Sequence, residues 1–142
     1  MKIIAYGSLM NQASLESTLG RPAQLQTIGV PGYRRVFNAP FDGFAFLNLQ
    51  RVPGSSLDAA WFELSEAETA KFAEREARSE LLELVPGCYA FVWPNRLTRD
   101  LPVLQSYINV CRTGATALGI NFAKGLTAPT SVIDDVRSPL YP

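Results

Sequence analysis

The sequence contains no histidine, and this absence excludes more chemistry than any other feature of the composition. Catalysis by Ser–His–Asp or Cys–His groups is excluded, and so are metal sites built on imidazole. Any acid–base step must therefore use a carboxylate, a lysine or a tyrosine.

Cysteine is scarce, and neither an excess of charge nor a long apolar run is present. Cys88 and Cys111 have no close spacing and no companions, so we expect buried thiols rather than a disulfide framework or a zinc site. The thirteen basic and thirteen acidic side chains cancel. No basic stripe is interleaved with aromatic residues, which argues against nucleic acid as a partner.

No apolar run reaches the length of a transmembrane span, and the N-terminus does not resemble a secretory signal. We therefore expect no membrane partner and a cytoplasmic location. The 142 residues, 47% of them hydrophobic, predict a single domain over residues 1–142 with a substantial core.

Short apolar runs with turn residues between them dominate the chain, and they predict an α+β protein. Its mixed, largely antiparallel sheet can close towards a small β-barrel, with a few flanking helices. Turns are expected at Pro31-Gly32 and Asp42-Gly43, and a loop at 53–56. Strands are expected at 2–6, 23–28, 33–37, 44–49, 59–64, 81–85 and 89–93. Helices are expected at 12–19, from Ser65 onward, from Pro102 onward, and briefly between Gly114 and Gly119.

The opening stretch of the chain predicts a candidate binding turn. A buried strand ends at Ala5-Tyr6, breaks at Gly7-Ser8, and leads into a helix after Asn11. Such a junction gathers backbone N–H groups that have no intrahelical acceptor, and they can hold a carboxylate or a developing oxyanion. On the local pattern alone, an ordinary strand–turn–helix junction is the more common explanation.

The helix that begins at Ser65 carries a carboxylate on its apolar face. Helical spacing puts Glu76 beside Phe72 and Ala73, while Glu74 can pair with Arg78 on another face. Burial would raise the pKa of Glu76 and make it a better base at neutral pH. The alternative is that Glu76 reaches solvent at the helix end or pairs with an arginine.

Tyr107 faces inward on the helix predicted from Pro102 onward. Most such tyrosines are simply core residues with one hydrogen bond.

Several segments together resemble the γ-glutamylcyclotransferase-like superfamily, which includes plant proteins of the avirulence-induced type. Residues 5–9 (Ala-Tyr-Gly-Ser-Leu) resemble its YGS(N/L) motif, and residues 32–38 resemble its G-[YW]-x-[RL]-x-F segment. Arg75-Glu76 resembles its catalytic-glutamate helix, and residues 105–108 and 138–142 resemble segments of bacterial members. Two departures are Ala59, where members often have glycine, and residues 77–79, where an aromatic often stands.

The resemblance implies a small sheet closing towards a barrel with a cavity at one end. It also implies intramolecular aminolysis, in which the α-amine of a γ-glutamyl group attacks its own side-chain carbonyl. This reaction gives 5-oxoproline and a free amine, and it needs no metal and no cofactor. Glu76 would be the catalytic base. The substrate-binding residues would be Tyr6, Gly7, Ser8, Leu9 and Tyr107.

Two alternatives stay open at this point. One is the same chemistry on γ-glutamyl amines rather than on peptides such as glutathione. The other is a non-catalytic member that binds a small carboxylate or a protein through the same cavity. A small-molecule γ-glutamyl substrate is the expected partner, and the sequence does not indicate an oligomeric state.

Overall fold

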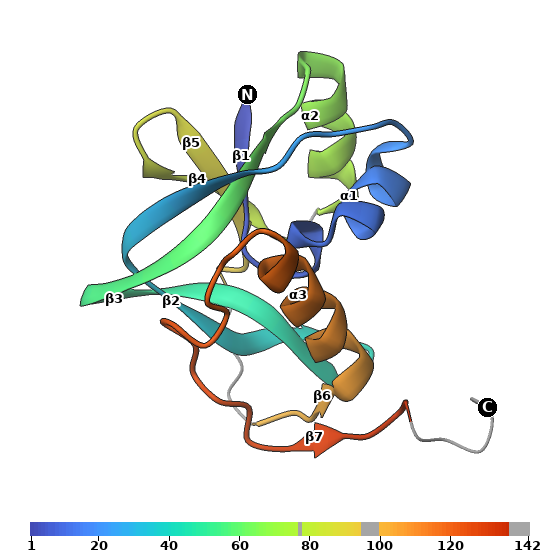
Figure 1. Ribbon diagram of the computed structural model, residues 1–142, viewed down its shortest axis with the longest axis vertical. Helices are drawn as coiled ribbons and strands as arrows, with labels where there is room; N and C mark the ends of the chain where they lie inside the picture. The colour runs from blue at the N-terminus through green and yellow to red at the C-terminus, as the bar shows by residue number, and fades with distance from the viewer. Residues whose placement is uncertain (77, 95–99, 137–142) are drawn as a thin grey trace.

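A five-stranded mixed sheet organises the structure, a computed structural model that describes residues 1–76, 78–94 and 100–136 (Figure 1). At its centre, β1 (Lys2–Ala5) pairs antiparallel with β3 (Phe44–Glu63) and parallel with β5 (Cys88–Val92). Outside these strands lie β2 (Gln26–Phe41), next to β3, and β4 (Glu80–Val85), next to β5. The spatial order is β2-β3-β1-β5-β4.

Three α-helices and one 3₁₀ turn flank this sheet, so the predicted α+β class with a mixed sheet is confirmed. The turn η1 (Ser8–Met10) leads directly into α1 (Gln12–Leu19). The other helices are α2 (Glu66–Arg75) and α3 (Gln105–Ala117). A small parallel pair, β6 (Val103–Leu104) and β7 (Val132–Ile133), lies below the sheet in Figure 1. Strand pairing among the described residues forms an open order from β2 to β4, and the expected barrel closure is not part of it.

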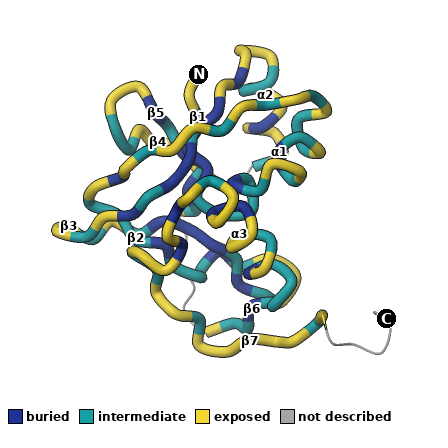
Figure 2. Tube along the Cα trace, in the orientation of Figure 1, coloured by how far each residue is buried: buried dark blue, intermediate teal, exposed yellow. Residues whose placement is uncertain are grey.

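The central strand is almost completely buried, as Figure 2 shows. Ile3, Ile4 and Ala5 are each at most 2% exposed. Ile3 and Ala5 belong to one core cluster, and Ile4 belongs to a second. Because adjacent side chains point to opposite faces of a strand, β1 supplies both clusters and ends between them. Packing of β1 in both clusters therefore holds the start of the turn that follows Ala5 in place.

Local sequence signals fix both ends of α1 and the start of α2 where they were predicted. The Asn11 side chain accepts the N–H of Ser14 at 3.2 Å, and Gly20 ends α1 in the left-handed region at φ 71°. Ser65 and Glu68 form the predicted capping box, with bonds of 3.1 and 2.9 Å. These caps determine where each helix begins relative to the sheet.

The predicted turn at Pro31-Gly32 and loop at 53–56 are wrong, because both segments lie inside the long antiparallel pair of β2 and β3. Pairing shifts register between Pro31, opposite Ser56, and Tyr33, opposite Arg51. The extra residues form a bulge, and both strands place a glycine there with positive φ. Turn residues within two otherwise paired strands thus bend the hairpin instead of ending it.

The boundaries expected for the last helix are also corrected. Pro102 does not open it, because residues 103–104 form β6 and the Pro102 carbonyl accepts the Ala45 N–H at 3.0 Å. Gly114 does not separate two helices either, since α3 runs through it. A Cβ at Gly114 would lie 2.5 Å from the backbone nitrogen of Asn11, so glycine is required for the helix to pack against the turn.

Three remaining points concern the cysteines, the helices and the tail. Cys88 and Cys111 are buried free thiols, as predicted. No helix among the described residues is long and apolar enough to cross a membrane. The tail segment 138–142 and Ala77, both used in the resemblance, lie outside the described residues.

Candidate active site

The turn after β1 presents backbone donors at one end of the sheet. The Met10 N–H bonds the Gly7 carbonyl at 3.1 Å, and the Asn11 N–H bonds the Ser8 carbonyl at 3.0 Å. The amides of Ser8 and Leu9 precede the first of these bonds, so the 3₁₀ turn supplies no acceptor for them. This is the donor arrangement that the sequence predicts.

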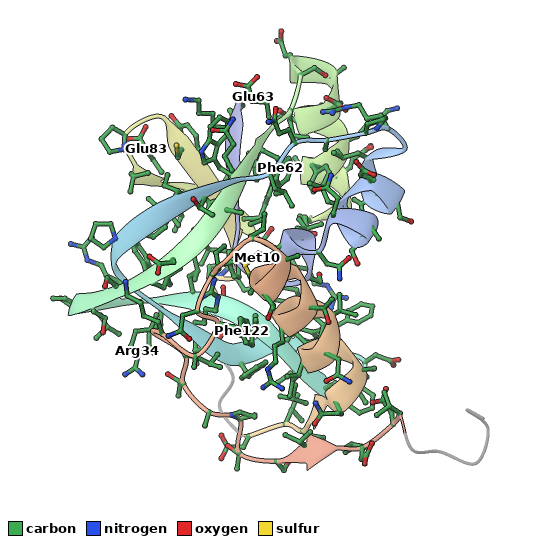
Figure 3. All side chains as sticks on the ribbon, in the orientation of Figure 1. Met10, Arg34, Phe62, Glu63, Glu83 and Phe122 are labelled. Carbon is green, nitrogen blue, oxygen red and sulfur yellow. The ribbon has the colours of Figure 1, made fainter. Side chains whose placement is uncertain are left out.

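A fully buried arginine holds this turn from behind. Arg35 Nε donates to the Tyr6 carbonyl at 2.7 Å, and Nη2 donates to the Asp58 carbonyl at 2.6 Å. Its guanidinium lies 5.3 Å from the Phe122 ring centroid and 3.4 Å from the Met10 sulfur, residues labelled in Figure 3. Burial lowers the pKa of Arg35 to about 10, so it is still a cation at neutral pH. A fixed positive charge therefore faces the Tyr6–Gly7 peptide.

Tyr107 on α3 supports the same turn from another direction. Its hydroxyl accepts the Leu47 N–H at 3.2 Å, and a Cβ at Gly7 would lie 3.0 Å from the hydroxyl oxygen. Burial and the neighbouring Cys111 thiol raise the pKa of Tyr107, so the phenol stays protonated. Gly7 is thus needed for close approach, and the Tyr107 hydroxyl packs against the turn.

The side chain of Tyr6 crosses from β1 to β5. Its hydroxyl donates to the Phe91 carbonyl at 2.6 Å. Burial raises the pKa of Tyr6, and the negative charge of Glu76 raises it further. Tyr6 and Glu76 also line the same cavity.

Glu76 lies at the end of α2, one residue later than its last helical residue. Its N–H bonds the Phe72 carbonyl at 2.8 Å, and the Ser79 N–H and hydroxyl both bond the Glu76 carbonyl. Phe72 is buried as predicted, whereas Ala73 is exposed, so the predicted apolar face is wrong at Ala73. Because the helix stops at Arg75, the helical spacing assumed for a Glu74–Arg78 pair does not exist.

One cavity of about 540 Å³ brings the predicted site together. All six residues singled out from the sequence line it: Tyr6, Gly7, Ser8, Leu9, Glu76 and Tyr107. The turn comes from the end of β1, Glu76 from the end of α2, and Tyr107 from α3. Their placement matches the prediction that the turn and Glu76 face the same space, while the role of each residue stays a prediction.

A second cavity of about 510 Å³ shares Ser8, Leu9 and Glu76 with the first. It runs between α1 and α2, which lie beside each other in Figure 1, and hydroxyl groups from α1 line it. These are Ser14, Ser17 and Thr18. The turn and Glu76 thus stand where a hydroxyl-lined cavity meets the larger one.

Nine of the described residues that line the larger cavity were not identified as site residues from the sequence, and they include Phe41, Phe46, Arg78 and Trp93. Arg78 is exposed and stands two positions after Glu76. Phe41 and Phe46 belong to β2 and β3, and Trp93 directly follows β5. The three aromatic residues stand in or beside apolar strand segments, so no local sequence signal separates them from core residues. Arg78 is one of residues 77–79, where the sequence departs from the family pattern. That departure was the only feature of the sequence that could have drawn attention to Arg78.

No family model matches the sequence, and no curated protein matches it. Several solved structures, in contrast, do match the structure of this chain. The structure is similar to one described as gamma-glutamyl cyclotransferase, with a TM-score of 0.73, 12% identity, and coverage of 95% of this chain and 94% of that one.

Two further matches come from a human and a bacterial protein. An uncharacterized protein from Homo sapiens matches with a TM-score of 0.68 and 12% identity, over 94% of this chain and 93% of that one. YkqA from Bacillus subtilis matches with a TM-score of 0.61 and 15% identity, over 82% of this chain and 48% of that one. Identities this low show a shared fold alone. The chain therefore has the fold of the γ-glutamyl cyclotransferase that it resembles.

Proposed function

We propose that the protein cyclises a γ-glutamyl amide or peptide to 5-oxoproline and releases the attached amine. The observation that carries this proposal is a cavity that is lined both by Glu76 and by all four residues of the Tyr6–Leu9 turn. Its volume of about 540 Å³ suits a small molecule. A sequence without histidine leaves a carboxylate as the natural base.

The proposed reaction needs no second substrate. The α-ammonium of the γ-glutamyl group loses a proton, and the neutral amine attacks the side-chain carbonyl carbon. A new C–N bond closes the five-membered ring, the carbonyl becomes an oxyanion, and the ring nitrogen gives up its second proton to water. The oxyanion then re-forms the carbonyl while the original C–N bond breaks, and the leaving amine takes one proton. Because attack is intramolecular, holding the folded-back substrate contributes much of the rate.

Glu76 would move the proton in both steps. Its carboxylate takes the proton from the ammonium, and the resulting carboxylic acid returns one to the leaving nitrogen. The buried Tyr6 phenol stays protonated nearby, with its own proton bonded to the Phe91 carbonyl. Tyr6 would therefore border the substrate and orient its neighbours, with no part in the proton transfer.

The turn would stabilise the oxyanion. The amides of Ser8 and Leu9 and the Ser8 hydroxyl are the donors at this end of the cavity, and one such donor is typically worth about 10²–10³-fold in rate. Tyr107 would hold the turn through its contact with Gly7. Arg78 lines the same cavity and would bind the substrate's α-carboxylate.

Replacing Glu76 tests the proposal directly. Glu76→Gln keeps the side-chain volume but removes the base, so the protein should fold while the rate of 5-oxoproline formation falls by about 10²–10⁴-fold. The assay uses a panel of γ-glutamyl amino acids and γ-glutamyl amines, with 5-oxoproline followed by mass spectrometry.

The matched control is Glu74→Gln. Glu74 is an exposed carboxylate on the same helix and does not line either cavity that contains Glu76. It should retain wild-type turnover. Wild-type turnover in Glu76→Gln would show that Glu76 is not the base. Binding of γ-glutamyl compounds without any 5-oxoproline would instead favour the non-catalytic, carboxylate-binding alternative.

A further inference from the structure

Aromatic side chains make up a large part of the lining of the larger cavity. We call Phe41, Phe46, Trp93 and Tyr107 the aromatic wall; all four line the cavity. Phe46 meets Tyr107 edge-to-face with ring centroids 4.8 Å apart, and Phe41 meets Phe46 at 6.3 Å. The row therefore runs from the Tyr107 ring beside Gly7 out to the tip of the β2–β3 hairpin.

The backbone that carries the aromatic wall is held in place. Phe46 lies on β3, and Trp93 follows directly after β5. The buried Asn48 side chain bonds both the N–H and the carbonyl of Trp93 at 3.0 Å, which joins that residue to β3. A surface fixed in this way can bind apolar groups without first being ordered.

The distribution of exposure and charge indicates what the aromatic wall binds. Phe41 is 58% exposed, although it continues the aromatic row. Among the described residues that line this cavity, the only charged ones are Glu76 and Arg78, which follow α2. A γ-glutamyl group is zwitterionic at its α-carbon, so its charged end suits Glu76 and Arg78. The group attached to the γ-carbonyl then extends along the aromatic wall.

We propose that the aromatic wall binds the leaving amine and selects γ-glutamyl compounds whose leaving amine carries an apolar, ring-sized group. This inference rests on the proposed function. The amine that departs when the γ-carbonyl C–N bond breaks is the part of the substrate that contacts Phe41, Phe46 and Trp93. Covering the exposed Phe41 ring removes apolar surface from water and strengthens binding.

Two substrates that differ only by a phenyl ring test this selectivity. γ-Glutamyl-phenethylamide and γ-glutamyl-ethylamide both release a primary alkylamine, so their intrinsic reactivities are similar. We expect kcat/KM for the phenethylamide to be roughly 10- to 100-fold higher. Equal values, or a preference for the ethylamide, would overturn the inference.

Two variants at exposed apolar residues test whether selectivity comes from the aromatic wall or from exposed apolar surface elsewhere. Phe41→Ser should lower the phenethyl-to-ethyl ratio several-fold, because it removes the exposed end of the wall. Leu82→Ser is the control, since Leu82 is also an exposed apolar residue, 38% exposed, but lies on β4 outside the cavity lining. Leu82→Ser should leave the ratio unchanged. An unchanged ratio in Phe41→Ser would contradict the proposed contact.

The affinity of both substrates for the Glu76→Gln protein, measured by calorimetry, tests the inference without relying on turnover. The phenethylamide should bind more tightly than the ethylamide, again by roughly 10-fold or more. If no compound gives 5-oxoproline but this binding preference is present, the proposed function fails and the aromatic wall stands as a binding surface. If 5-oxoproline forms but neither kcat/KM nor affinity depends on the ring, the proposed function stands and the inference fails.

Discussion

The two sides of the Tyr6–Leu9 turn differ in how firmly they are built. Behind the turn, the buried Arg35 bonds the Tyr6 carbonyl, and the Tyr107 hydroxyl packs against Gly7. Gly114 of α3 lies against Met10 and Asn11 without room for a side chain. In front of the turn, Phe41 and Arg78 are exposed and border open space.

This difference separates two tasks. A trans peptide points its C=O and N–H in opposite directions, so the bond from Arg35 to the Tyr6 carbonyl fixes the direction of the Gly7 N–H. The rear of the turn thus holds the Tyr6–Gly7 peptide from which the Ser8 and Leu9 amides continue. The front contains the side chains that contact a substrate, and they can vary without disturbing the fold. We therefore expect rear substitutions to change stability and front substitutions to change selectivity.

The largest effect of this kind is expected for Arg35→Met. Methionine fills similar space but leaves the Tyr6 and Asp58 carbonyls without their donor, which should lower the free energy of unfolding by about 2–5 kcal/mol. The loss is limited because Arg35 Nη1 has no hydrogen-bond partner among the described residues, so removing this buried charge also relieves a cost. Urea denaturation of Arg35→Met and wild type measures this difference in the free energy of unfolding.

Arg78→Gln is the matched change on the front side. Because Arg78 is exposed, the free energy of unfolding of the Arg78→Gln protein should stay within about 0.5 kcal/mol of wild type. Its KM for γ-glutamyl substrates should rise roughly three- to tenfold as the bond to the α-carboxylate is lost. If Arg35→Met were as stable as wild type, or Arg78→Gln clearly less stable, the comparison between the two sides would be wrong.

A second change behind the turn, Gly7→Ala, is measured as turnover. Its Cβ would lie 3.0 Å from the Tyr107 hydroxyl oxygen and 3.7 Å from Leu47 Cβ, so the turn must shift by a few tenths of an ångström. We expect turnover to fall by about 10-fold, because small displacements of catalytic groups are costly.

A double-mutant cycle identifies the cause of that loss. In the Tyr107→Phe background the hydroxyl is absent, so adding Gly7→Ala should cost less than it does in wild type. Tyr107→Phe alone leaves the Leu47 N–H without its acceptor, and this is why the single variant must be measured as well. Strict additivity of the two changes would show that the Tyr107 hydroxyl does not limit the space at Gly7.

Features set by neighbouring residues could be predicted from the sequence. The caps of α1 and α2, the turn at Asp42-Gly43 and the β4–β5 hairpin all depend on residues a few positions apart. The fold was predictable because several short motifs occur in one order along the chain, and the same motifs led to the six candidate residues that line one cavity. Each of those motifs is weak when taken alone.

Features set by distant contacts could not be predicted. Gly114 looks like a helix terminator until α3 is seen to pack against Asn11. Phe41 and Phe46 cannot be told from core aromatic residues in the sequence, and only the folded β2–β3 pair shows that they line the cavity. The end of α2 at Arg75, one residue before Glu76, also has no sequence signal, and it decides how Glu76 meets the turn.

The central claim is that this cavity cyclises its substrate rather than hydrolysing it, and the fate of solvent oxygen tests that most directly. The protein is incubated with γ-glutamyl-phenethylamide in water enriched in ¹⁸O, with Glu76→Gln as the control for spontaneous cyclisation. Our account predicts 5-oxoproline without ¹⁸O, in equal amount to the released amine and formed far more slowly by Glu76→Gln. Glutamate carrying ¹⁸O in its γ-carboxylate, or 5-oxoproline at the same rate with both proteins, would contradict it.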